Sequence, residues 1–201
     1  MDAHKLQLKI FVTPESAQAI RLDAFIGIFH RWIKDHVLPE LVVDVANYAH
    51  VPEGPGVVLI GHESDYFMDE GEGRLGLMQS RKRAGPPTAD RLNDLARRTF
   101  YAAWLLEQDP SLSGGLRFAT NELLFRINDR LVAPATDATF RTVQPELESW
   151  ADRVFAGSVR VSRSGGPGDL LAARVTSPTS PPLSTLLDRV GGPPATRATS
   201  G

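Results

Sequence analysis

Residues 41–83 read LVVDVANYAHVPEGPGVVLIGHESDYFMDEGEGRLGLMQSRKR, and their pattern decides the fold class. Apolar, β-branched and aromatic residues dominate three runs, at 41–51, 57–69 and 74–80, which are joined by the turn-like sequences EGPG and EGEG. Connections this short join antiparallel neighbours, because a parallel crossover needs about a dozen residues or more. The stretch therefore predicts three consecutive strands of an antiparallel sheet.

Residues Gly71 to Gly76 in this stretch match the motif G-x-G-x-x-G at every position. A dinucleotide-binding fingerprint needs a strand that passes through the glycines into a helix, whose first amides receive the pyrophosphate. Here the glycines lead into RLGLMQS, which alternates as a strand does, and Asp69, Glu70 and Glu72 would repel a phosphate. We interpret the motif as a hairpin connection in which glycine supplies positive φ.

The remaining chain predicts helices on one side of this sheet. KLQLKIFV at 5–12 alternates as a strand, and an apolar stripe at helical spacing follows Thr13 and Pro14 as far as Pro39. A second helix is expected from Thr88, and a third from Asp137 to about Phe155, which Pro145 should kink or divide. LRFATNELLFRIND is expected as one bent strand or a hairpin, and 158–175 as two short strands around a glycine-rich loop.

The sequence thus predicts an α+β fold: a mostly antiparallel sheet of about six to eight strands packed against three main helices. We expect a single domain over residues 3–176. From Ser177 the chain becomes rich in Pro, Ser, Gly and Thr, so residues 177–201 are expected to form a flexible tail.

Composition excludes several function classes. The 201 residues are 42% hydrophobic, enough for a substantial core, and the formal net charge of −2 gives no general attraction for nucleic acid or anionic membrane. The absence of cysteine excludes disulfides, thiolate metal sites and cysteine nucleophiles. Without an apolar leader or a long apolar span, we expect a cytoplasmic protein that binds neither nucleic acid nor membrane. Arginine greatly outnumbers lysine, as is typical of GC-rich bacterial genomes.

Histidine and carboxylate residues cluster around GHESD, at 61–65, and are the candidate catalytic residues. If strands 43–51 and 57–65 pair, Ala46 should lie near His62 and Asp44 near Ser64, which could give a carboxylate, an imidazole and a hydroxyl. No G-x-S-x-G elbow supports a serine nucleophile. General acid–base work by His62, Glu63 and Asp65 is therefore the catalytic hypothesis, and a solvated strand edge is the alternative.

The same region offers a metal-binding hypothesis. Asp44, His50 and His62 would provide nitrogen and oxygen ligands suited to zinc, iron or manganese. The spacing is not diagnostic, because residue 66 is a tyrosine where H-E-x-x-H needs a second histidine. No specific motif implies a cofactor.

The expected tail contains a short amphipathic segment over residues 183–190. Leu183, Leu186, Leu187 and Val190 stand at i, i+3, i+4 and i+7, which is one face of a helix. Two turns of helix are marginal alone in water, so the segment needs a groove from a partner or from its own domain. The two possibilities stay open at this point.

The leading functional hypothesis is a non-catalytic accessory or assembly protein that acts through protein–protein contacts. Residues 183–190 would serve as its docking peptide, and homo-oligomers are possible. The alternative is a metal- or small-ligand-binding enzyme that uses the cluster around His62.

Overall fold

A computed structural model describes residues 5–52, 54–83, 91–112, 114–166 and 168–195. Within these residues eight strands form one sheet, and every neighbouring pair is antiparallel. In spatial order the strands are β2 (Val42–Tyr48), β3 (Gly56–Gly61), β4 (Ser64–Asp69), β5 (Gly76–Arg81), β1 (Leu6–Val12), β6 (Phe118–Ile127), β8 (Leu171–Thr176) and β7 (Arg160–Ser164). The expected antiparallel α+β fold is confirmed.

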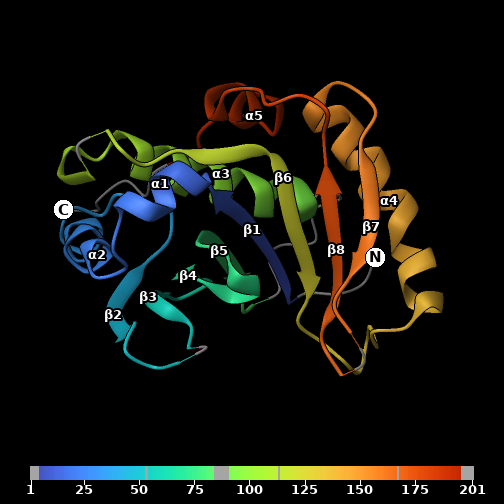
Figure 1. Ribbon diagram of the computed structural model, residues 1–201, viewed down its shortest axis with the longest axis horizontal. Coiled ribbons are helices and arrows are strands. Elements are labelled where there is room, and N and C mark those ends of the chain that lie inside the picture. Colours follow the sequence, from blue (N-terminus) through green and yellow to red (C-terminus); the bar gives the residue numbers. More distant parts are fainter. Residues whose placement is uncertain (1–4, 53, 84–90, 113, 167, 196–201) are drawn as a thin grey trace.

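Helices pack against one face of this sheet (Figure 1). The three longest are α2 (Ala24–Lys34), α3 (Arg91–Gln108) and α4 (Asp137–Phe155), and the shorter ones are α1 (Pro14–Ala19) and α5 (Leu183–Arg189). The described residues also contain two 3₁₀ turns, η1 (Gly71–Gly73) and η2 (Pro110–Leu112). Helix α3 packs on β1 and β5, α2 lies on β2, and α4 contacts β7 and β8.

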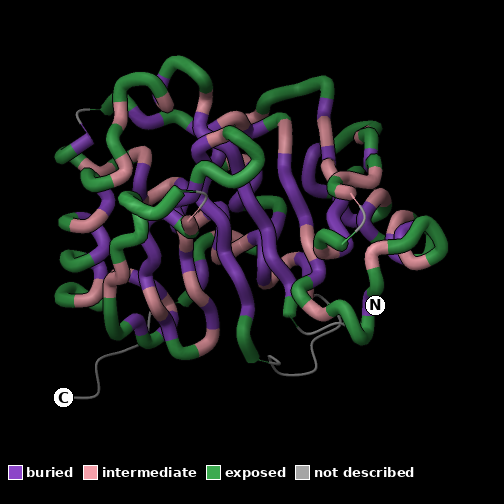
Figure 2. The backbone as a smooth tube through the Cα atoms, turned by 60° about the horizontal axis from the view of Figure 1, so that its bottom comes forward, coloured by how far each residue is buried: buried purple, intermediate pink, exposed green. Residues whose placement is uncertain are grey.

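The alternation of each strand divides the sheet into two faces. In β1, Leu6, Leu8, Ile10 and Val12 belong to the main core beneath the helices, whereas Gln7, Lys9 and Phe11 point to the opposite face. Phe11 forms a separate small cluster with Leu124 and Ala172 on that face. Buried residues run through the strands, and exposed residues gather at the loops (Figure 2).

Two local expectations are wrong. The chain between 57 and 69 is two strands, because Gly61 and Ser64 flank a tight turn at His62 and Glu63. The single helix expected up to Pro39 is two helices, since Ile20 is extended with φ −113° and ψ 131° and ends α1.

Helix α4 has the expected bounds, but the division expected at Pro145 does not occur, because one helix runs through the proline. Proline removes the amide that would bond the Arg141 carbonyl, but both residues are exposed, so water can solvate that carbonyl. Residues 118–127 form one strand, with a register irregularity against β1. The expected helix start at Thr88 lies outside the described residues.

Residues expected as a flexible tail are placed against the domain up to residue 195. Helix α5 packs on α3 and α4, so the described part of this segment belongs to the domain. The four spaced apolar residues explain why, because they complete the core at this point. No described helix is both long enough and apolar enough to cross a membrane.

Candidate functional site

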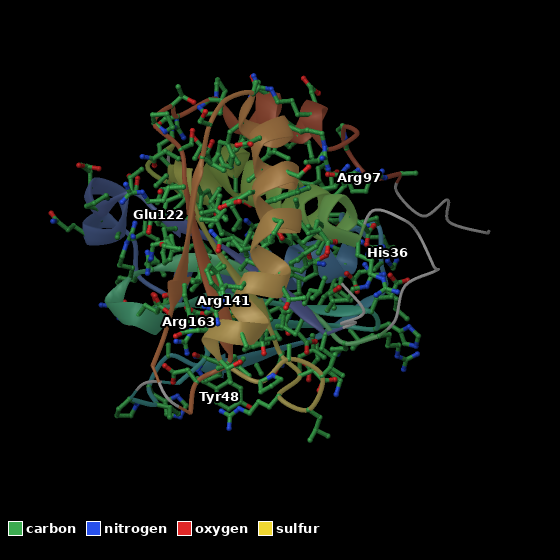
Figure 3. All side chains as sticks on the ribbon, turned by 90° about the vertical axis from the view of Figure 1, so that its right-hand side faces the viewer. His36, Tyr48, Arg97, Glu122, Arg141 and Arg163 are labelled. Carbon is green, nitrogen blue, oxygen red and sulfur yellow. The ribbon has the colours of Figure 1, made fainter. Side chains whose placement is uncertain are left out.

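Charged side chains gather on the sheet face opposite the main helices. They project from β6 and β8 and from the loop between β4 and β5, and they comprise Glu72, Arg74, Glu122, Arg126 and Arg174, here called the arginine–glutamate network. Figure 3 shows Glu122 on one side of the molecule and Arg97 of α3 on the other. The network is therefore separated from the helix layer by the sheet.

A buried aromatic ring lies beneath this network. Phe11 is 0% exposed, and the guanidinium carbon of Arg74 lies 4.0 Å from its ring centroid. The guanidinium of Arg174 and the ammonium of Lys9 lie 5.5 Å and 5.3 Å from the same centroid. Three cations thus share one ring, whose negative face attracts each of them.

Two carboxylates neutralise the arginines. One Arg74 nitrogen lies 2.8 Å from both oxygens of Glu122, and Arg174 donates to the same carboxylate. Although partial burial alone would raise the pKa of Glu122, the hydrogen bonds from Arg74 and Arg174 hold it below the ordinary value of 4.5. Glu122 therefore stays ionised within the network.

Glu72 supplies the second carboxylate from a loop. Its two oxygens accept from Arg126 at 2.9 Å and from Arg174 at 2.6 Å. The backbone of Glu72 is left-handed, with φ 63° and ψ 25°, which costs a residue with a side chain on the order of 1–3 kcal/mol. The ion pairs hold this conformation in place.

Lys9 fixes the base of the same loop. Its ammonium donates to the Asp69 carboxylate and to the carbonyls of Gly71 and Arg74, both at 2.9 Å. Burial lowers the pKa of Lys9, and the charge of Asp69 opposes that shift. Gly76 leaves room for this side chain, because a Cβ there would lie 2.6 Å from the Lys9 Cε. The G-x-G-x-x-G thus lies in a connection between antiparallel strands, as expected, but it also surrounds a buried lysine.

Two depressions adjoin this loop. One of about 540 Å³ lies between Leu22, residues of the β2–β3 connection (Tyr48, Ala49, Val51, Gly54 and Gly56), and the segment from Glu70 to Gly73. The other, of about 450 Å³, is lined by residues of β1 and α1 together with Glu70, Gly73 and Arg74. A small molecule could therefore approach both Glu72 and Arg74.

A second polar cluster is buried on the helix-covered face. The Glu40 side chain is 0% exposed and accepts hydrogen bonds from the amides of Glu63 and Ser64, from the Tyr66 hydroxyl, and from Arg98. Burial, and then the charge of Glu40, raise the pKa of Tyr66 well above its ordinary value. Because Glu40 ties the β3–β4 turn to α3, we assign this cluster a structural role.

The residues of the catalytic hypothesis lie at this β3–β4 turn. His62 is exposed, Glu63 pairs with Arg98 at 3.0 Å, and Asp65 pairs with Lys82 at 2.7 Å. Ser64 is fully buried on the helix side. The expected pairing of Ala46 with His62 is wrong, since Ala46 pairs with Val58.

The residues of the metal hypothesis lie on different segments. Asp44 is opposite Ile60, His50 is in the β2–β3 loop, and His62 is in the β3–β4 turn, and all three are exposed. Among the described residues, no group of three or more His, Cys, Asp or Glu side chains could hold a metal ion.

The residues of the docking hypothesis are covered by their own domain. Leu186 is 0% exposed, and Leu183, Leu187 and Val190 are 3–4% exposed. Arg189 also donates to the carbonyl of Val154 in α4 at 2.9 Å. A partner could reach these leucines only if α5 left the domain.

Exposed apolar side chains lie instead at strand β2. Six large hydrophobic residues are exposed in the described part of the chain, and four of them belong to β2 or its flanks: Leu41, Val43, Tyr48 and Val51. Strand β2 is at one end of the sheet, so its outer backbone edge has no neighbouring strand within the described chain. Sequence reasoning identified the strand but not its position at the edge.

Comparisons with known proteins found no similarity: no family model, no curated protein and no solved structure matches this chain. Function must therefore be argued from the residues themselves. Sequence reasoning missed Lys9, Glu122 and Arg174, although each is a charged residue within a mainly apolar strand. That placement was the available signal.

Proposed function

We propose that this protein is a non-catalytic assembly protein and that it forms a homodimer through the free edge of β2. The observation that carries the proposal is the concentration of exposed apolar side chains on this edge strand and its flanks. An unpaired, apolar strand edge offers backbone donors and acceptors to another strand.

The opposite edge of the sheet supports the proposal by contrast. Strand β7 has Arg160 and Arg163 among its five residues, and charges of this kind discourage edge pairing. Strand β2 has one charged residue, Asp44, among its seven. Only one of the two edges is thus protected by charge.

A second copy is the occupant that the residue pattern fits. A bulge leaves Val43 outside the ladder with β3, so the regular edge covers residues 44–48. Antiparallel self-pairing about Ala46 would place Asp44 opposite Tyr48, and the two Asp44 residues roughly 13 Å apart. Leu41 and Val43 of one copy would then lie beside Tyr48 and Val51 of the other. Such a contact is self-complementary, as a twofold dimer requires.

The test is the mass of the particle in solution. Light scattering coupled to size exclusion should give a dimer for the natural sequence and a monomer for Val43→Lys. Leu131→Lys is the matched control, because Leu131 is 97% exposed in the β6–α4 loop, away from β2, and its variant should stay dimeric. A natural protein that is monomeric throughout its soluble range, or a Val43→Lys variant that still dimerises, contradicts the proposal.

A further inference from the structure

Arg126 and Arg174 are diagonal neighbours on adjacent strands, since Arg126 pairs with Ala172 and Arg174 pairs with Leu124. Two guanidinium groups in this position repel each other unless an anion bridges them. The bridging anion is the Glu72 carboxylate, which comes from a loop rather than from either strand.

The loop is held at its base by Lys9 and at its tip by the Glu72 carboxylate. Lys9 binds Asp69 and the carbonyls of Gly71 and Arg74, so the base is fixed. The tip contains Glu72 in a left-handed conformation, between Gly71 and Gly73. A Cβ on Gly73 would meet no atom within 4 Å, so nothing packs closely there. The ion pairs of the Glu72 carboxylate therefore hold the tip in place. The flanking glycines allow its backbone to rotate once these pairs break.

We propose that Arg74, Arg126 and Arg174 form a binding site for a small-molecule phosphate monoester, and that Glu72 occupies this site in the unliganded protein. When the ligand binds, the Glu72 side chain leaves and the phosphate takes its place between the guanidinium groups. The three arginines lie outside the β2 edge, on β6, β8 and the β4–β5 loop, whereas Tyr48 and Val51 belong both to that edge and to the larger depression beside the loop.

Charge and geometry favour this ligand class. Three guanidinium groups face two carboxylates, so removal of Glu72 leaves Glu122 alone and two uncompensated positive charges. A phosphate monoester has a charge between about −1.5 and −2 at pH 7 and three acceptor oxygens. Arginine presents paired donors that suit such a group. Side-chain exposures of 36%, 21% and 28% for Arg74, Arg126 and Arg174 leave the site accessible.

The remainder of the ligand has space beside the loop. Glu72 lines the larger depression and Arg74 the smaller, and both depressions include Glu70 and Gly73. Tyr48 and Leu22 give the larger one an apolar wall. Neither depression is lined by Arg126 or Arg174, so an organic group bonded to the phosphate would extend past Glu72 or Arg74 to reach the depressions.

The experiment is calorimetric titration of inorganic phosphate into the full chain at pH 7 in Bis-Tris buffer, which is cationic and does not compete for the arginines. Replacing Glu72 by Gln removes the competing charge and keeps the side-chain size, so Glu72→Gln should bind phosphate at least tenfold more tightly than the natural protein. Glu15→Gln is the matched control: Glu15 is an exposed acid of α1 that lines neither depression, and its replacement changes the net charge equally. That control should bind as the natural protein does.

The double variant Glu72→Gln with Arg126→Gln should lose the gain. Equal affinity in Glu72→Gln and the natural protein, an equal gain in Glu15→Gln, or a gain that survives loss of Arg126 would each overturn the proposal. Glu72→Gly relieves the positive φ and supplies a second test if Glu72→Gln does not fold. The oligomeric state should be unchanged in all of these variants.

Discussion

Replacing Lys9 by Met tests the buried ion pair that fixes the glycine-rich loop. The Lys9 side chain is 1% exposed and that of Asp69 is 8% exposed, so the substitution would leave a buried carboxylate with no ammonium. Removing one partner of a buried pair costs about 3–5 kcal/mol. Asp69 keeps a hydrogen bond from the Gly71 amide at 2.9 Å, which favours the lower end of that range.

The assay is urea unfolding, followed by tryptophan fluorescence, together with thermal unfolding. For a chain of this length a loss of about 3–5 kcal/mol lowers the melting temperature by about 6–20 °C. Lys5→Met is the control, because Lys5 is exposed immediately before the same strand and its replacement should change stability by less than about 0.5 kcal/mol.

A second substitution separates loss of charge balance from loss of packing. Asn at position 69 has no charge, and its side-chain oxygen can still accept from the Gly71 amide. Lys9→Met combined with Asp69→Asn should therefore be more stable than Lys9→Met alone. If Lys9→Met loses less than about 1 kcal/mol, or if the second change adds further loss, the buried-pair reasoning is refuted.

Two further predictions concern α5 and the buried tyrosine. Leu186→Ala should destabilise the protein by about 2–5 kcal/mol, as expected for a fully buried leucine. Asp188 is exposed, so Asp188→Ala is the control and should have little effect. If urea unfolding shows equal, negligible losses for both variants, α5 is not packed on the domain. Because the pKa of Tyr66 is raised in the folded state, its hydroxyl ionises first in the unfolded chain, so stability should fall as the pH rises above about 10. Tyr66→Phe should lack this component of the fall, and an identical pH slope in both proteins would contradict the assignment.

The sequence by itself determined the elements whose signals are local. Period-two alternation located β1 and β5, Thr13 marked the start of the first helix, and the predicted bounds of α4, Asp137 and Phe155, agree with the structure. Short connections made the antiparallel arrangement unavoidable, because no crossover fits between 41 and 83.

Only the tertiary structure decided which surfaces remain free. The spacing of Leu183 to Val190 required an apolar groove but could not say whose, and α3 and α4 supply it. Strand β2 became an edge because β1 and β6 pair beside β5, a pairing between residues far apart in the chain. The arginine–glutamate network depends on the same pairing, which brings Glu72, Glu122 and Arg174 within hydrogen-bond distance. Local patterns specify helices and strands because neighbouring residues share a backbone geometry. Contacts between residues 48–102 positions apart in the sequence depend instead on how all the strands pair in the sheet.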